Sequence, residues 1–214
     1  MPKLTLIAVG GNALLRAGQA GTIAEQRANA ALTARHLVQP VRHGFFMVLT
    51  HGNGPQVGAQ LLRSELAATQ VSPEPLDVCV ADTEGSIGYR LERALQDALA
   101  DAQLTIPVVT VIAQVVDDDH DPAFQHPTKP VGPFYSADEA QQRMCDLGWR
   151  MVEDAARGYR RVVASPTPID IVELVQFGRN PFQVCRQDAG CSSAPTVYCL
   201  VPTINQLASS ADMY

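Results

Sequence analysis

The 214-residue sequence has no apolar run long enough to cross a membrane as a helix. The run LTLIAV at residues 4–9 ends at a glycine pair and is too short for the apolar region of a secretory signal. Basic residues are scattered, and 16 Lys and Arg stand against 22 Asp and Glu, a formal net charge of −6. We therefore expect a cytoplasmic protein with no membrane and no nucleic-acid partner.

Cysteine is scarce, and its spacing shows no metal-binding or disulfide pattern. The five cysteines are an odd number without a C-x-x-C pair, so free thiols are expected rather than a disulfide framework or a zinc site. Acidic residues do cluster at 117–121, but consecutive side chains cannot all face one ion. This stretch is predicted to be a solvated loop, and no metal site is expected.

Apolar residues make up 46% of the sequence and charged residues 18%, the balance of a globular chain with a substantial core. Short apolar runs alternate with amphipathic segments, which predicts an α/β fold with a mainly parallel sheet and helices on both faces. Strands are predicted at 4–9, 45–50, 106–116 and 159–165. Helices are predicted from 22 to about 44, from 56 to 68 and from 136 to 148, and a longer one follows the turn at 71–75 and runs to about 102.

Two of these helices begin with a capping box, in which a hydroxyl residue and a glutamate three positions later cap each other's backbone N–H groups. Thr22 and Glu25 form the first box, and Ser136 and Glu139 form the second. Both helix starts are therefore predicted from local sequence alone.

Two segments depart from the regular alternation. Residues 117–135 are acidic and then rich in proline, and the segment is too long for a plain connection, so it is predicted to be a functional excursion or small subdomain. After residue 173 only four charged residues remain, together with three of the five cysteines. Because no amphipathic helix or strand pairing is evident there, 174–214 is predicted to be a divergent, poorly ordered tail on a lobe formed by 1–173.

Two loops rich in glycine and asparagine follow the first two predicted strands. Gly10, Gly11 and Asn12 come after the first, and the stretch HGNGP at 51–55 comes after the second. The first loop taken alone favours a tight turn, and the second taken alone is as consistent with a turn as with a binding site. Because the carboxyl ends of parallel strands share one edge of a sheet, the two loops are expected to converge there. Their backbone N–H groups would then form a cradle for a compact anion.

Lys129 lies in the proline-flanked stretch PTKPVGP at 127–133. A lone lysine in a loop is usually a solvated charge, but prolines on both sides restrict the backbone and leave little entropy to lose. A fixed ammonium group near a transferring phosphoryl group can neutralise charge on its oxygens. We therefore treat Lys129 as the candidate catalytic residue.

The stretches AVGGNALL, THGNGPQVG, DPAFQHPTKPVGPFY and RRVVASPTP resemble the carbamate kinases, a family within the amino-acid kinase superfamily. The resemblance covers residues 3–173 in order, and the lysine segment is its most particular part. It implies a three-layer α/β/α sandwich, a cytoplasmic homodimer and the reaction ATP + carbamate ⇌ ADP + carbamoyl phosphate in arginine or nitrogen catabolism. By position, Lys129 would be catalytic, and the substrate-binding residues would be Gly10, Gly11, Asn12, Gly52, Asn53 and Gly54.

The sequence also departs from the family pattern. Carbamate kinases use ATP with Mg²⁺, and the second half of the family's chain supplies the nucleotide site, with motifs such as an Asp-Lys-Asp triplet. None of these motifs occurs in this sequence, so the nucleotide half is expected to be largely missing. The leading hypothesis is a carbamate kinase-like phosphotransferase. The alternative is a truncated, non-catalytic lobe that binds carbamoyl phosphate or a partner subunit without turnover, and a kinase for another acceptor is a third possibility that the lysine segment disfavours.

Overall fold

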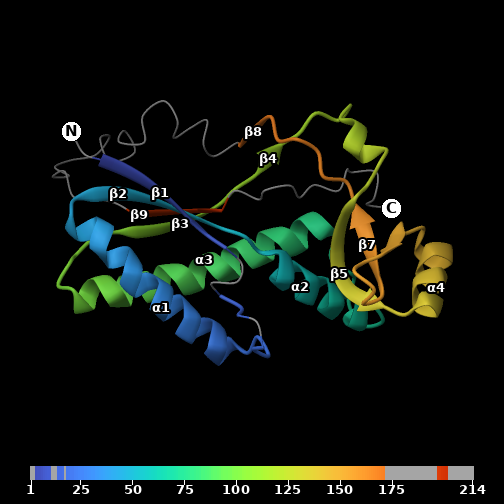
Figure 1. The fold of residues 1–214 in the computed structure, drawn as a ribbon, viewed down its shortest axis with the longest axis horizontal. Helices are drawn as coiled ribbons and strands as arrows, with labels where there is room; N and C mark the ends of the chain where they lie inside the picture. Colours follow the sequence, from blue (N-terminus) through green and yellow to red (C-terminus); the bar gives the residue numbers. More distant parts are fainter. Residues whose placement is uncertain (1–2, 11–13, 17, 172–196, 202–214) are drawn as a thin grey trace. The chain divides into compact units, whose positions relative to one another are not determined.

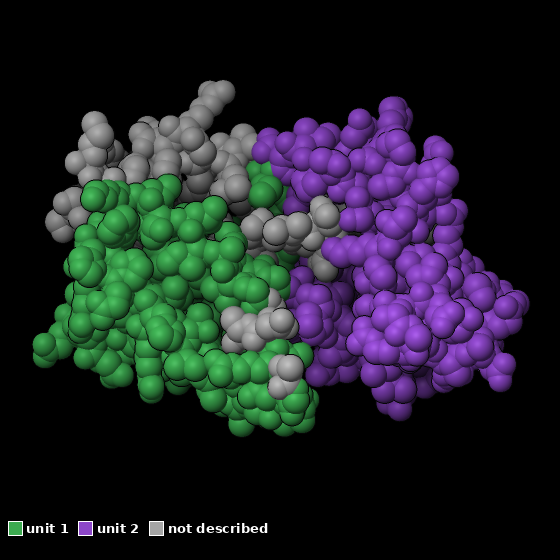
Figure 2. Space-filling view, viewed as in Figure 1, with its two compact units in different colours: residues 1–52, 84–114, 171–202 green, residues 53–83, 115–170, 203–214 purple. Residues whose placement is uncertain are grey.

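The computed structural model describes residues 3–10, 14–16, 18–171 and 197–201. The chain divides into two compact units, each of which draws on distant segments of the sequence (Figure 2). Unit 1 comprises 1–52, 84–114 and 171–202, and unit 2 comprises 53–83, 115–170 and 203–214. None of the described helices has the length and hydrophobicity that crossing a membrane would require.

Unit 1 is built on a four-stranded sheet with the order β1-β2-β9-β3. All three neighbouring pairs are parallel, as the alternation of strands and helices predicts. β1 and β2 pair over their whole lengths, from Lys3 opposite Phe45 to Val9 opposite His51. The strands are β1 (Lys3–Val9), β2 (Phe45–His51), β3 (Val108–Ile112) and β9 (Val197–Val201).

Two long helices, α1 (Ile23–Arg42) and α3 (Leu76–Asp101), supply the core of unit 1 (Figure 1). Residues 84–101 of α3 belong to this unit, and their apolar side chains recur every fourth residue, which places them on one face of the helix. The buried side chains of this core come from α1 (Ala30, Ala34, Leu37, Val38, Val41), α3 (Ile87, Leu91, Leu95, Leu99) and the sheet (Val9, Met47, Leu49, Val108), with Leu14 beside them.

The opposite face of the sheet carries no comparable core in the described part of unit 1. Side chains alternate between the faces of a strand, and Leu4 and Leu6 of β1 are 52% and 69% exposed. The helices on both faces that the sequence predicts are therefore seen on one face only among the described residues.

Unit 2 contains a three-stranded antiparallel sheet with the order β5-β7-β6, together with a two-stranded pair of β4 and β8. A second core forms where α2 and the start of α3 meet this sheet, through Val57, Leu76, Val80, Val131 and Val163. The elements of this region are α2 (Gly54–Ala67), β4 (Val115–Val116), a short 3-10 helix (Pro122–Phe124), β5 (Lys129–Tyr135), α4 (Ala137–Leu147), β6 (Met151–Glu153), β7 (Tyr159–Val163) and β8 (Asp170–Ile171).

The strands of the structure differ from those predicted in three places. The single strand predicted at 106–116 is two strands, β3 and β4, which belong to different sheets. The end of the 117–135 excursion is a regular strand, β5, and its prolines are tolerated because β5 lies at an edge of its sheet. The segment 174–214 contains β9, which the sequence did not predict and which pairs with both β2 and β3. The remaining residues of that segment lie outside the described part of the chain.

Both predicted capping boxes are present, and the second provides a direct test of helix stability. In α4 the Ser136 hydroxyl accepts from the Glu139 N–H at 3.3 Å, while the Glu139 carboxylate accepts from the Ser136 N–H at 2.8 Å. Ser136→Ala is expected to lower the free energy of unfolding by about 1 kcal/mol, because it removes one of these bonds. Urea denaturation measures this effect, and Ser136→Asp, which can still cap, should restore most of the loss.

Candidate functional site

The glycine loops of unit 1 follow directly on adjacent strand ends. Val9 and His51 are opposite each other in the last register position of β1 and β2, and the Gly52 N–H donates to the Val9 carbonyl at 3.3 Å. Gly10 and Gly52 therefore lie side by side at one edge of the sheet, as predicted. Both are exposed, and a Cβ added at Gly10 would meet no atom within 4 Å. Gly11 and Asn12 lie outside the described residues.

His51 closes β2 with a buried imidazole that is 5% exposed. Its Nδ1 lies 3.3 Å from the Gly52 carbonyl, which can only accept, so the proton is assigned to Nδ1. Nε2 is buried and has no hydrogen-bond partner among the described residues. Burial, with a smaller contribution from the Arg90 guanidinium, lowers the pKa of His51 to about 4, so the ring is neutral at pH 7.

The other part of the second loop lies in unit 2, where it starts α2. Asn53 is the N-cap residue and Pro55 lies in the first turn. The first N–H groups of a helix have no partner within the helix and carry positive partial charge, which suits an anion. Asn53 makes no side-chain capping bond; its Nδ2 donates instead to Thr83 Oγ1 at 3.1 Å.

Gln56, also in the first turn of α2, carries a second polar group without a partner. Both its Nε2 and its Oε1 are buried and lack a hydrogen bond within the described part of the chain. Buried amide atoms are usually paired, because an unmade bond is costly. The sequence analysis identified neither Gln56 nor Thr83, since a glutamine or threonine inside a helical pattern carries no local signal.

Lys129 is the first residue of β5 and is half-buried, with its backbone opposite Val163 of β7. Burial lowers the pKa of Lys129 from its ordinary value. The lysine is held by a strand pairing rather than by an irregular proline-flanked loop, which gives it a fixed main-chain position in unit 2.

A cluster of polar side chains secures the far end of β5 within unit 2. The Glu65 carboxylate of α2 accepts from Tyr135 Oη at 2.7 Å and from Arg143 Nε at 2.9 Å. The Arg143 guanidinium also lies 4.0 Å from the centre of the Tyr135 ring. Burial and the bond to Glu65 raise the pKa of Tyr135, so its hydroxyl remains a donor.

A cavity of about 640 Å³ lies beside this cluster. Its lining includes the carboxylates of Glu74, Asp77 and Asp146, and that of Glu65, which is paired with Arg143, against the guanidinium of Arg161. This excess of negative charge disfavours an anion, so the cavity is not the candidate site for a phosphorylated substrate.

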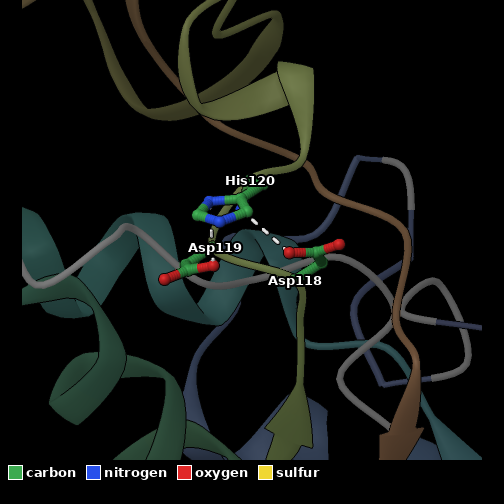
Figure 3. A group of neighbouring side chains, drawn as sticks. All are labelled: Asp118, Asp119 and His120. Atoms are coloured by element: carbon green, nitrogen blue, oxygen red, sulfur yellow. Dashed lines mark hydrogen bonds and ion pairs between the residues drawn. The ribbon is translucent and has the colours of Figure 1, made fainter.

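Asp118, Asp119 and His120 form an exposed group in which one potential ligand atom from each lies within 4.8 Å of the others (Figure 3). His120 Nδ1 lies 3.1 Å from Asp119 Oδ1, and Asp118 Oδ1 accepts from the His120 N–H at 2.9 Å. These three consecutive side chains thus lie closer together than we expected from the sequence, where consecutive residues are expected to face different directions. Their exposure and mutual pairing fit the predicted solvated loop.

Sequence and structure comparisons point to one family. The chain is 45% identical over 181 residues to the carbamate kinase of Pyrococcus horikoshii, a match covering 84% of this chain and 58% of the relative. It is also similar to a solved carbamate kinase from Giardia lamblia bound to AMP-PNP, with a TM-score of 0.79 and 36% identity over 95% of this chain and 62% of that one. The chain is a homologue of the carbamate kinases.

A further relative is the carbamate kinase-like protein YahI of Escherichia coli, which is 44% identical over 208 residues. This match covers 89% of the present chain and 65% of YahI. The carbamate kinase homologues that the chain matches are thus longer than the chain, which spans less than two thirds of their length. No protein-family model matches the chain. The α/β fold predicted from the sequence is confirmed by these structural neighbours.

Proposed function

We propose that the chain forms the acceptor-binding part of a carbamate kinase-like phosphotransferase. In this reaction a carbamate oxygen bonds to the γ-phosphorus of ATP, the bond from that phosphorus to ADP breaks, and carbamoyl phosphate forms. The observation that carries the proposal is the 45% identity to a carbamate kinase over 84% of the chain. The cytoplasm, a homodimer and a place in arginine or nitrogen catabolism are part of the same proposal.

Within this proposal, the glycine loops bind carbamate and the transferred phosphate. Gly10 and Gly52 lie at adjacent strand ends, and a Cβ at Gly10 would meet no atom within 4 Å, so a small anion can approach the backbone there without hindrance. The Gly52 N–H already donates to the Val9 carbonyl, so Gly52 contributes its position at this edge rather than a free donor. Gly11, Asn12, Asn53 and Gly54 are assigned to the same substrate by their positions in the two loops. The N-terminus of α2 adds positive partial charge beside Gly54.

Lys129 is proposed as the catalytic residue. Its ammonium group would neutralise charge on the phosphoryl oxygens as the phosphorus moves between acceptor and donor. Partial burial supports this role, because a charge removed from water interacts more strongly with a bound anion.

ATP with Mg²⁺ is the proposed phosphoryl donor, in line with a relative solved with AMP-PNP. Bound Mg²⁺ would neutralise phosphate charge, and it prefers oxygen ligands in octahedral geometry. The one group of three potential ligands among the described residues, 118–120, does not fit, because it includes an imidazole and its Asp118 carboxylate already accepts from a backbone N–H. These three residues are therefore not assigned to Mg²⁺.

The alternative proposal is a lobe that binds carbamoyl phosphate without turnover, with 1–173 as the binding lobe and 174–214 as a divergent tail. A coupled assay for ATP formation from ADP and carbamoyl phosphate, run on the 214-residue polypeptide, separates the two. Turnover supports the enzyme. Saturable binding of carbamoyl phosphate by ³¹P NMR without ATP formation supports the binding lobe, and the absence of both contradicts both proposals.

A further inference from the structure

The cavity of about 640 Å³ lies wholly within unit 2, and its volume is typical of a small-molecule site. Its lining comes from α2, the loop before α3, the start of α3, β5, the end of α4 and β7. None of the residues assigned above to carbamate or to the phosphoryl group belongs to this lining. The chemistry of the lining itself therefore has to show what the cavity can bind.

One part of the lining is apolar and aromatic. Leu61 of α2 lines the cavity and also packs against the core of unit 2. The rings of Tyr135 and Trp149, which also belong to the lining, form a tilted pair whose centres lie 6.4 Å apart. Arg161 stacks on Trp149 at 4.8 Å from the centre of the ring. This wall suits the hydrocarbon body of a ligand, and its rings attract positive charge.

The other part of the lining is acidic, and two of its carboxylates are carried by a restrained backbone. Glu74 lies between Pro73 and Pro75, whose rings fix the main chain, and the Glu74 N–H donates to Ser64 Oγ at 2.7 Å. Asp77 follows in the first turn of α3. These two carboxylates therefore keep their places beside the cavity whether or not a ligand is bound.

Asp146 is the most informative carboxylate of the lining. It lies in the last turn of α4, where the carbonyl groups carry negative partial charge and a further negative charge is unfavourable. The next residue, Leu147, also lines the cavity and is 55% exposed, so an apolar surface lies directly beside the acid. The stability of α4 does not account for either side chain, whereas a ligand with a positive and an apolar end would contact both.

We propose that this cavity binds a small organic cation, an ammonium group carried on an apolar body. The ammonium group lies among the carboxylates of Glu74, Asp77 and Asp146, and the apolar body packs against Leu147 and Trp149. Charge complementarity selects the positive end, and the aromatic wall distinguishes such a ligand from an inorganic cation, which would leave that wall uncovered. The proposal goes beyond the proposed function, because the substrates of that function are anions.

The sequence contains one tryptophan, so the fluorescence of Trp149 reports directly on the cavity. The test titrates the 214-residue protein with hexylamine, 1-hexanol and hexanoate, which share a six-carbon chain and differ in charge. Hexylamine is expected to give a saturable change with a dissociation constant on the order of 1 mM, as suits a ligand of this size. 1-Hexanol should bind at least about tenfold more weakly, and hexanoate more weakly still.

Asp146→Asn removes one of the charges and should weaken hexylamine binding about tenfold. The substitution relieves an unfavourable interaction with the α4 dipole, so a loss of binding does not reflect unfolding, and urea denaturation verifies this. Asp82→Asn is the matched control, because Asp82 is exposed on α3 and does not line the cavity. This variant should bind hexylamine like the unaltered chain.

Equal affinities of Asp146→Asn and Asp82→Asn for hexylamine overturn the proposal, as does binding of 1-hexanol or hexanoate that is as tight as that of hexylamine. Displacement of hexylamine by MgCl₂, but not by NaCl of equal ionic strength, assigns the carboxylates to an inorganic ion and also overturns it. An affinity that falls as the protein concentration rises shows that a second copy of the chain occupies the cavity instead. Failure to bind carbamoyl phosphate contradicts the proposed function alone, because the titration with hexylamine does not depend on it.

Discussion

Lys129→Ala is expected to lower the rate of ATP formation from ADP and carbamoyl phosphate about a hundredfold or more. Removing one preorganised group that stabilises developing charge typically has an effect of this size. Partial burial strengthens the interaction, since the ammonium group is poorly screened by water there, as the lowered pKa of Lys129 also reflects. The coupled ATP assay measures the rate, and if the unaltered chain shows binding only, the expected result is a weaker affinity for carbamoyl phosphate.

The sequence offers a matched control for this substitution, because it contains only two lysines. Lys3 is exposed at the start of β1, so Lys3→Ala removes the same charge with no expected effect on turnover. Lys129→Arg keeps the charge on a larger group and should retain part of the activity. A rate for Lys129→Ala equal to that of Lys3→Ala, in protein of unchanged urea stability, would remove Lys129 from the proposed mechanism.

Protonation of His51 is expected to lower the free energy of unfolding by about 3 kcal/mol as the pH is lowered from 7 to 4. Burial holds the pKa of His51 at about 4 in the folded chain, against 6.5 in the unfolded chain. The unfolded state therefore binds more protons within this window. The contribution of the neutral ring is complete above pH 6.5 and is lost as the pH falls toward 4. Urea denaturation at a series of pH values measures the slope.

His51→Gln removes the titrating ring and should flatten the dependence of unfolding free energy on pH in this window. His43→Gln is the matched control, because His43 is exposed at the end of α1 and no comparable effect is expected there. Carboxylates titrate in the same range, so the quantity compared is the difference in slope between each variant and the unaltered chain. Equal slopes for the two variants would contradict the assignment to His51.

Features held by local interactions were predicted well from the sequence. Both capping boxes form as expected, because their partners lie within one helical turn. The adjacent ends of β1 and β2 were also predicted, since a strand–helix–strand unit with short turns brings its two strands together in parallel. The side-by-side placement of Gly10 and Gly52 follows from this pairing alone, while the anion cradle itself stays a prediction.

Features that depend on distant partners were missed. β9 forms a strand between β2 and β3, which pair with it on either side. No strand was predicted in this segment from its sequence. The predicted strand at 106–116 is divided because Val108–Ile112 and Val115–Val116 find partners in different sheets. Thr83 was missed for the same reason, since its bond to Asn53 joins residues thirty positions apart.

The sequence by itself determined the local elements of this protein, its mixed α/β character and the placement of two glycine loops at adjacent strand ends. Periodicity, caps and glycine loops are properties of neighbouring residues, and they need no knowledge of the rest of the chain. Only the tertiary structure decided that Lys129 begins a paired strand, that His51 is buried and neutral, and that Asn53 pairs with Thr83. Burial and side-chain orientation depend on what lies across the fold, and residues far away in sequence supply those surroundings.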